Sequence, residues 1–156
     1  MKSLIKSFGY AFSGIFTCIR NERNMRIHLS VAAYMFGFLG FFDWFTVSRT
    51  QYALLFIMCA VVMAGELVNT AVERAVDLAC RERNPFAKTA KDCAAGAVLI
   101  SALFAVCCGI AVLWQPEAFR AMFAYYRTHW YMLFVLALSL AGTFLFIFAM
   151  PKSKED

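Results

Sequence analysis

The feature that most constrains this chain is a stretch of 21 residues, 130–150, that contains no charged side chain. A helix of that length rises about 30 Å, which matches the hydrocarbon thickness of a bilayer. Hydrophobic residues make up 62% of the chain and charged residues only 16%, whereas about 25% is usual in a soluble domain. Because this apolar excess has to face lipid, the sequence predicts an integral membrane protein.

Three further apolar segments predict three more membrane spans. The first runs from about Ile27 to Val47, and the second is helical from about Gln51 to Cys80. The third is a long helix that begins at Asn84-Pro85 and ends near Trp114, because Asn is a good N-cap and Pro suits the first helical position. Residues 115–129 are expected to form a short polar and aromatic connection to the fourth span.

The first 20 residues predict an amphipathic helix that lies in the membrane interface. Bulky apolar side chains recur there at spacings of three and four, and basic or small polar side chains occupy the opposite face. The apolar positions are Leu4, Ile5, Phe8, Ala11, Phe12, Ile15, Phe16 and Ile19. The predicted fold is therefore an all-α membrane protein with one interfacial helix and four transmembrane helices.

The basic residues predict the orientation of the chain. Of 15 lysines and arginines, all but Arg49, Arg120 and Arg127 lie before the first span, between the second and third, or after the fourth. By the positive-inside rule both termini are expected in the cytoplasm. Since these residues flank apolar runs, the net charge of +5 indicates anionic lipid headgroups and favours no nucleic-acid partner.

A polar stripe in the second span carries the chemistry. Glu66, Asn69, Glu73 and Asp77 are spaced by three, four and four residues, which places them within about 80° on one helix face. Glu66 lies about 16 Å along the axis from Asp77, so it is expected deep in the membrane. An acid there costs about 2.5–3.5 kcal/mol and needs a partner or a purpose. A buried hydrogen-bonded network that joins the helices is the structural alternative.

Carboxylates that converge at a membrane face suit Mg²⁺ together with phosphate oxygens. Glu22, just before the first span, offers a second carboxylate, and Lys91 with Lys88 one turn earlier offers positive charge at the same level. A metal, carboxylates and a lysine are what phosphoryl transfer needs. The sequence has no glycine-rich phosphate loop, so side chains and metal would have to hold the phosphates.

At these residues the chain resembles the prokaryotic diacylglycerol kinase family, which includes undecaprenol kinases. The matching stretches are residues 21–28, 66–77 and 90–99. The resemblance implies a homotrimer in the bacterial inner membrane whose composite sites phosphorylate a lipid alcohol with MgATP. It also implies a kinase domain over residues 1–115 and an extension over 116–156 that carries the additional span.

The resemblance assigns roles by matching position. Glu22 and Glu73 would bind Mg²⁺, Glu66 would be the general base, and Asn69 would position groups near the reacting hydroxyl. Lys91 would contact the transferred phosphate. Further residues expected on the nucleotide side are Tyr10, Asp77 and Asp92.

Two questions stay open at the level of sequence. Residues 23–28 and 90–99 look more like the undecaprenol kinase branch, so undecaprenol is the favoured lipid and diacylglycerol the alternative. A small oligomeric channel or proton-coupled transporter is the alternative of another class, because intramembrane acids also mark ion paths. A purely structural scaffold would leave Glu66 unexplained.

Overall fold

The computed structural model describes residues 2–80 and 82–149, with side chains from Leu4 onward. These residues form six helices and no strand, which confirms the all-α prediction. In chain order the helices are α1 (Lys2–Asn21), α2 (Arg23–Phe41), α3 (Arg49–Ala79), α4 (Pro85–Leu113), α5 (Pro116–Thr128) and α6 (Tyr131–Phe148).

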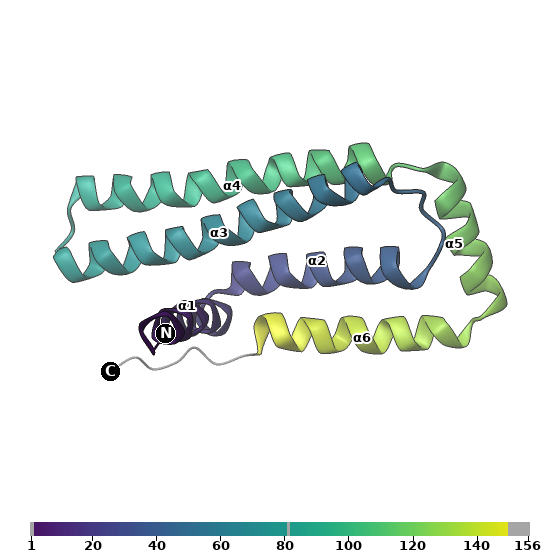
Figure 1. Cartoon of the computed structure of the whole chain (residues 1–156), viewed down its shortest axis with the longest axis horizontal. Helices are drawn as coiled ribbons and strands as arrows, with labels where there is room; N and C mark the ends of the chain where they lie inside the picture. Colours follow the sequence, from purple (N-terminus) through teal and green to yellow (C-terminus); the bar gives the residue numbers. More distant parts are fainter. Residues whose placement is uncertain (1, 81, 150–156) are drawn as a thin grey trace.

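Four helices run side by side and form a bundle (Figure 1). The long helices α3 and α4 make an antiparallel hairpin, and α2 packs against both α3 and α6. The short helix α5 crosses one end of the bundle and carries the chain from α4 to α6, whereas α1 lies toward the opposite end and projects away from the bundle. The bundle therefore has one end near α1 and another near α5.

The helices α3, α4 and α6 are, within the described residues, long and apolar enough to cross a membrane. This result confirms three of the four predicted spans. Helix α2 has 19 residues, but its first turn carries Arg23 and Arg26, which shortens its apolar length. It lies beside the three spans, and its own crossing stays a prediction.

The helix starts follow local sequence signals. Asn84 accepts a hydrogen bond from the Phe86 backbone nitrogen at 2.8 Å, and Pro85 is the first residue of α4, as the sequence predicts. Helix α2 ends at Phe41 and not near Val47, so the predicted first span is too long at this end. The main chain becomes extended at Phe42, and α3 begins only after Ser48, where Ser48 and Gln51 exchange hydrogen bonds in a capping box.

Residues 115–129 connect α4 to α6, as the sequence predicts, and Pro116–Thr128 forms the helix α5 within this connection, for which no helix was predicted. Proline at its first position favours a helix start, and Ala118 is buried on its inner face. The Gln115 side chain also fixes this end, since its amide exchanges hydrogen bonds of 3.1 and 3.0 Å with the Thr46 backbone. Aromatic rings of α5 then pack on the residues that follow α2, with Tyr125 against Phe42 and Trp44.

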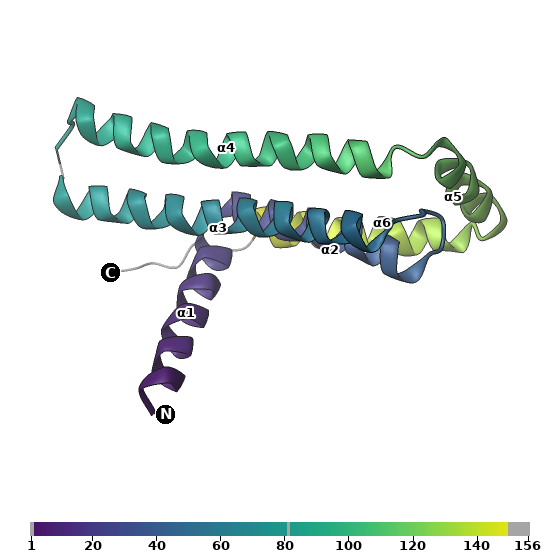
Figure 2. The same cartoon turned by 45° about the horizontal axis from the view of Figure 1, so that its top comes forward.

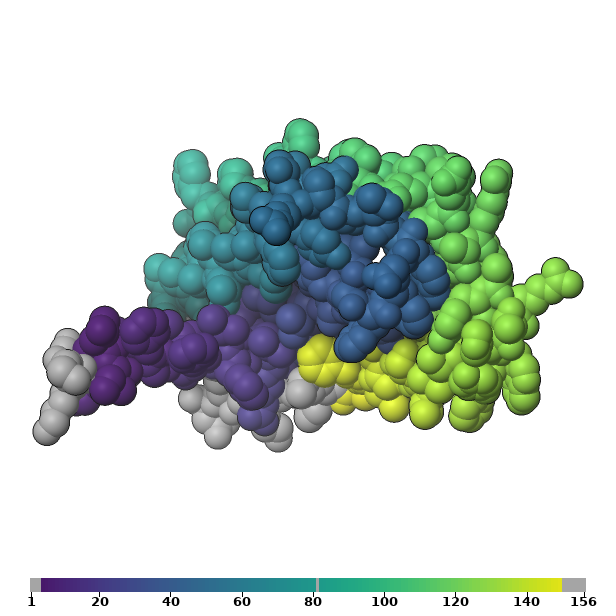
Figure 3. All heavy atoms as spheres, turned by 45° about the vertical axis from the view of Figure 1, so that its right-hand side comes forward, coloured from purple at the N-terminus to yellow at the C-terminus, as the bar shows by residue number. Residues whose placement is uncertain are grey.

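The amphipathic N-terminal helix is present as α1, which leaves the bundle at a steep angle (Figures 2 and 3). Only its C-terminal part contacts α2 and α3, and Cys18 is buried there. The apolar side chains of its earlier turns are exposed, including Leu4, Ile5, Phe8, Phe12 and Phe16. A helix with one uncovered apolar face suits the interface of a membrane that the bundle crosses.

Candidate active site

The deepest polar group of the bundle is the Glu66 carboxylate on α3, which is 2% exposed. Helix α2 presents His28 to it, with 3.4 Å between His28 Nε2 and Glu66 Oε1. A cavity of about 240 Å³ opens at this point between α2, α3 and α4. Its lining is mostly apolar and consists of Asn24, Ile27, His28, Glu66, Asn69, Ala95, Val98, Leu99 and Ala102.

Close packing of α3 on α4 and α1 holds the main chain around Glu66. The Val98 side chain would lie 3.6 Å from a β-carbon placed on Gly65, so the two helices approach closely one residue before the acid. Thr70 donates a hydrogen bond of 2.9 Å to the Glu66 carbonyl and lies 3.4 Å from the Cys18 sulfur of α1. These contacts fix the backbone, and the carboxylate is left to face the cavity.

Two buried oxygens at this cavity accept no hydrogen bond of good geometry from the described residues, although the His28 ring lies 3.4 Å from the first of them. They are Glu66 Oε1 and Asn69 Oδ1, both on the same helix face. The Asn69 amide nitrogen is used, because it donates to Glu73 Oε1 at 3.0 Å. Buried acceptors that lack a donor are costly. A hydroxyl group that entered the cavity would supply the missing donor.

Glu22 lies at the junction of α1 and α2, where it is half-buried at the N-cap position of α2. Its negative charge affects the pKa of the Cys18 thiol. Burial raises this pKa, and the hydrogen bond with Thr70 lowers it. The charges of Glu22 and Glu66 raise the pKa, and the charge of Arg74 lowers it. Arg74 lines a small cavity beside Cys18 and Thr70, where α1 contacts α3.

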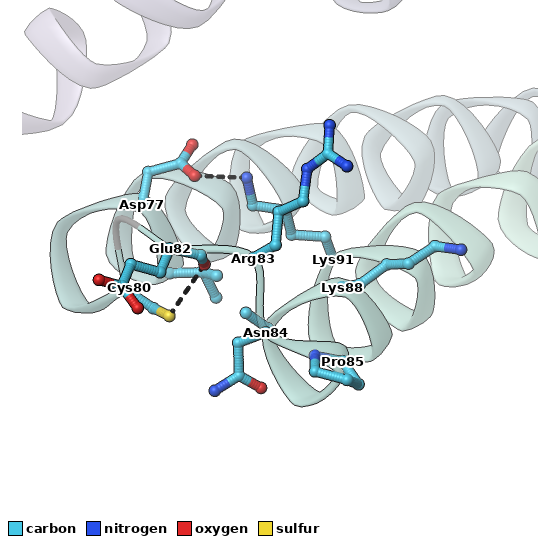
Figure 4. A pocket seen from close by; sticks show the side chains of 10 residues that line it. Asp77, Cys80, Glu82, Arg83, Asn84, Pro85, Lys88 and Lys91 are labelled. Carbon is cyan, nitrogen blue, oxygen red and sulfur yellow. Dashed lines mark hydrogen bonds and ion pairs between the residues drawn. The ribbon is translucent and has the colours of Figure 1, made fainter.

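A second, larger cavity of about 660 Å³ lies at the α3–α4 connection (Figure 4). Lys91 of α4 donates a hydrogen bond of 2.5 Å to the Asp77 carboxylate of α3, as Figure 4 shows. Arg83 and Lys88 also line this cavity. It is more exposed and more basic than the cavity at Glu66, which suits a phosphorylated, water-soluble molecule.

The predicted site residues therefore fall into groups. Glu66, Asn69 and Glu73 are brought together on α3, and Asp77 is joined to Lys91. Tyr10 and Asp92 are exposed and line neither cavity within this chain. His28 was given no role from the sequence, although it ends the stretch 21–28 that resembles the family, because its position opposite Glu66 depends on how α2 packs against α3.

The donor set allows a test of whether Mg²⁺ fits. No group of three His, Cys, Asp or Glu side chains that could hold a metal occurs within residues 2–80 and 82–149. Mg²⁺ usually takes one or two carboxylates and completes its shell with water and substrate phosphates. Glu73 has a second carboxylate oxygen beyond the one that accepts from Asn69, and Glu22 is half-buried at the start of α2. Each therefore offers a carboxylate oxygen of the kind that Mg²⁺ takes when it arrives with a nucleotide.

A buried acid beside a mostly apolar cavity, and a second cavity with an excess of basic side chains at the bundle end, suit a membrane enzyme that acts on a lipid and a phosphorylated co-substrate. Comparison with known proteins agrees with this class. The model of the family described as "Prokaryotic diacylglycerol kinase" matches residues 9–113. The chain belongs to the prokaryotic diacylglycerol kinase family.

Relatives of known name are similar over most of the same region. The undecaprenol kinase of Bacillus subtilis is 34% identical over 114 residues, which cover 72% of this chain and 89% of the relative. A diacylglycerol kinase of Synechocystis is 39% identical over 115 residues, 73% of this chain and 64% of the relative. The Escherichia coli diacylglycerol kinase is 31% identical over 112 residues, 72% of this chain and 89% of the relative. No solved structure matches the chain.

Proposed function

We propose that this protein transfers the γ-phosphoryl group of ATP to the hydroxyl of a membrane lipid, with undecaprenol as the favoured acceptor. The observation that carries the proposal is a pair of buried oxygens, Glu66 Oε1 and Asn69 Oδ1, that accept no well-formed hydrogen bond in an apolar-lined cavity, with the His28 ring 3.4 Å from the first of them. Diacylglycerol is the second candidate, because the relative from Synechocystis bears that name and is 39% identical.

In the proposed reaction the lipid hydroxyl enters from the bilayer side and donates its hydrogen to Glu66. As the oxygen attacks the γ-phosphorus, Glu66 takes the proton, the bond to the β-phosphate oxygen breaks, and ADP leaves. Asn69 orients the hydroxyl through its free carbonyl oxygen and holds Glu73 through its amide nitrogen. Lys91 leaves its hydrogen bond to Asp77, contacts the nucleotide, and stabilises charge on the transferred phosphate.

We propose that Glu22 and Glu73 hold Mg²⁺ together with ATP. The ion would neutralise charge on the phosphates. Tyr10 and Asp92 remain candidates for the nucleotide side. They would reach a site only in a composite arrangement between subunits, because each is exposed within one chain.

We propose a homotrimer with both termini in the cytoplasm of a bacterium. Residues 1–115 would form the kinase domain and residues 116–156 the extension, and the family match, which ends at residue 113, supports this boundary. The location of most basic residues at the α1 end of the bundle supports the orientation. The mass of the purified protein in detergent, measured by light scattering with the detergent subtracted, tests the trimer.

The experiment that tests the activity is a radiolabelled ATP assay of the purified protein with undecaprenol and diacylglycerol offered side by side. We expect label in both lipid products at high lipid concentration, and a higher kcat/KM for undecaprenol. The Glu66→Gln variant should lose the transfer, whereas Ser101→Ala on α4 should keep it, because that hydroxyl only donates to the Ala97 carbonyl of its own helix. Transfer to neither lipid by the intact protein would refute the proposal.

A further inference from the structure

The guanidinium group of Arg26 joins the ends of two helices that are far apart in the sequence. Arg26 is 4% exposed in the first turn of α2. Its Nη1 donates to the carbonyls of Ile19 and Arg20 at 3.1 and 2.7 Å, in the last turn of α1. Its Nε and Nη2 both donate to the carbonyl of Ile147 at 3.1 and 2.9 Å, in the last turn of α6.

Each of these acceptors is a carbonyl that a helix leaves unpaired at its C-terminal end, where the helix dipole also places partial negative charge. A planar guanidinium with five donors can serve two such ends at once, which a lysine cannot do. These four hydrogen bonds of the guanidinium all go to main-chain carbonyls at helix ends. Arg26 therefore caps α1 and α6 together.

Other contacts keep α6 in register with α2. The Tyr34 hydroxyl lies 3.0 Å from Ser139 Oγ and 3.1 Å from Thr143 Oγ1. The Arg23 guanidinium lies 5.8 Å from the ring centre of Phe148. The space-filling view shows α6 against the side of the bundle (Figure 3). These residues of α6 lie beyond the segment 9–113 that matches the family.

We propose that α6 acts as an internal strap that, through Arg26, holds the C-terminal end of α1 on α3 and keeps Glu22 in position. Glu22 is four residues before Arg26, and its amide nitrogen bonds to the Cys18 carbonyl at 2.8 Å in the same junction. Arg26 is thus a positioning residue that acts through Glu22. The part of this inference that concerns nucleotide binding rests on the proposed kinase function.

The docking of α1 can be measured without any kinase assay, because Cys18 is 1% exposed between α1 and α3. In a full-length chain whose other cysteines are replaced by alanine, N-ethylmaleimide reaches Cys18 only when α1 opens. The labelling rate then reports the open population. The replaced positions are Cys59, Cys80, Cys93, Cys107 and Cys108.

We expect Arg26→Gln to raise the Cys18 labelling rate about tenfold, because charge-assisted hydrogen bonds to the end of α1 are lost. The labelling rate of Arg26→Lys should lie between those of the parent chain and of Arg26→Gln, since an ammonium group can serve one helix end. Ser101→Ala should leave the rate unchanged. An unchanged rate in Arg26→Gln would overturn the proposal.

The role of α6 is tested by Tyr34→Phe, a mild change that removes only the hydroxyl bonded to Ser139 and Thr143. We expect it to raise the Cys18 labelling rate about threefold when Arg26 is present. In a chain that already carries Arg26→Gln, Tyr34→Phe should have no further effect. Equal effects of Tyr34→Phe with and without Arg26, or no effect in either case, would overturn the strap.

In the phosphotransfer assay, Arg26→Lys should raise KM for MgATP about tenfold while kcat and the lipid KM stay within about twofold. A labelling response without any kinase activity would keep the strap and refute the kinase function.

Discussion

The division of labour between Glu66 and Glu73 yields the sharpest prediction. The two residues are seven positions apart on α3, which separates them by about 10 Å along the helix axis. Glu66 is 2% exposed at the apolar-lined cavity, whereas Glu73 is half-buried nearer the α3–α4 connection. A lipid hydroxyl would reach the deeper acid, and MgATP would reach the shallower one. Substitution should therefore affect different steps at the two positions.

The expected magnitudes follow from these roles. Glu66→Gln keeps the shape of the side chain but cannot accept a proton, so kcat should fall about 10²–10⁴-fold, with little change in KM for MgATP. Glu73→Gln removes a negative charge but keeps an oxygen that can accept from Asn69. It should raise KM for MgATP and shift the Mg²⁺ dependence to higher concentration, each by about tenfold.

The assay is a set of initial rates on purified protein, with MgATP, free Mg²⁺ and lipid varied in turn. Nucleotide binding measured by titration separates binding from turnover, and far-UV circular dichroism verifies that each variant is helical. Ser101→Ala serves as the matched control on the neighbouring helix. If Glu66→Gln mainly weakened MgATP binding and Glu73→Gln mainly lowered kcat, the assigned roles would be reversed.

Three further predictions concern the surroundings of these acids. Lys91→Met should raise KM for MgATP about tenfold in titrations. Asp77→Asn should have a smaller effect on this KM, because it removes only the carboxylate that Lys91 contacts when no nucleotide is bound. His28→Gln should lower kcat about tenfold in initial-rate measurements with KM for MgATP unchanged, since the ring lies 3.4 Å from Glu66. A single cysteine introduced at Arg127 should react with an impermeant maleimide from outside intact cells, and reaction only after lysis would contradict the orientation.

Local signals in the sequence predicted much of the fold. The start of α4 was predicted because Asn84 and Pro85 act within one turn, and the face of α3 was predicted because helical spacing alone places Glu66, Asn69 and Glu73 together. The helix over residues 116–128 was not predicted, because this segment was interpreted only as a short polar and aromatic connection. Its aromatic rings in fact lie on a helix that packs against Trp44.

The remaining features depend on contacts between helices, which spacing along one helix does not encode. His28 meets Glu66 only in the register that α2 adopts on α3. The acceptor for Arg26 on α6 is a main-chain carbonyl, which any residue at position 147 would supply. Such partners leave no residue-type signal, although an arginine in the first turn after a junction between two helices is a reason to search for helix ends nearby.

The burial of the polar stripe changes steadily along α3 and suggests how the proposed reaction excludes water. Glu66 is 2% exposed, Asn69 and Glu73 are half-buried, and Asp77 is exposed. A lipid would thus reach the stripe at its dry end and a nucleotide at its wet end, so their reactive groups would meet near Asn69 and Glu73. Water that enters from the basic cavity would encounter the phosphates before it reaches Glu66. The base would then find the lipid hydroxyl as its accessible proton donor, which favours transfer to lipid over hydrolysis of ATP.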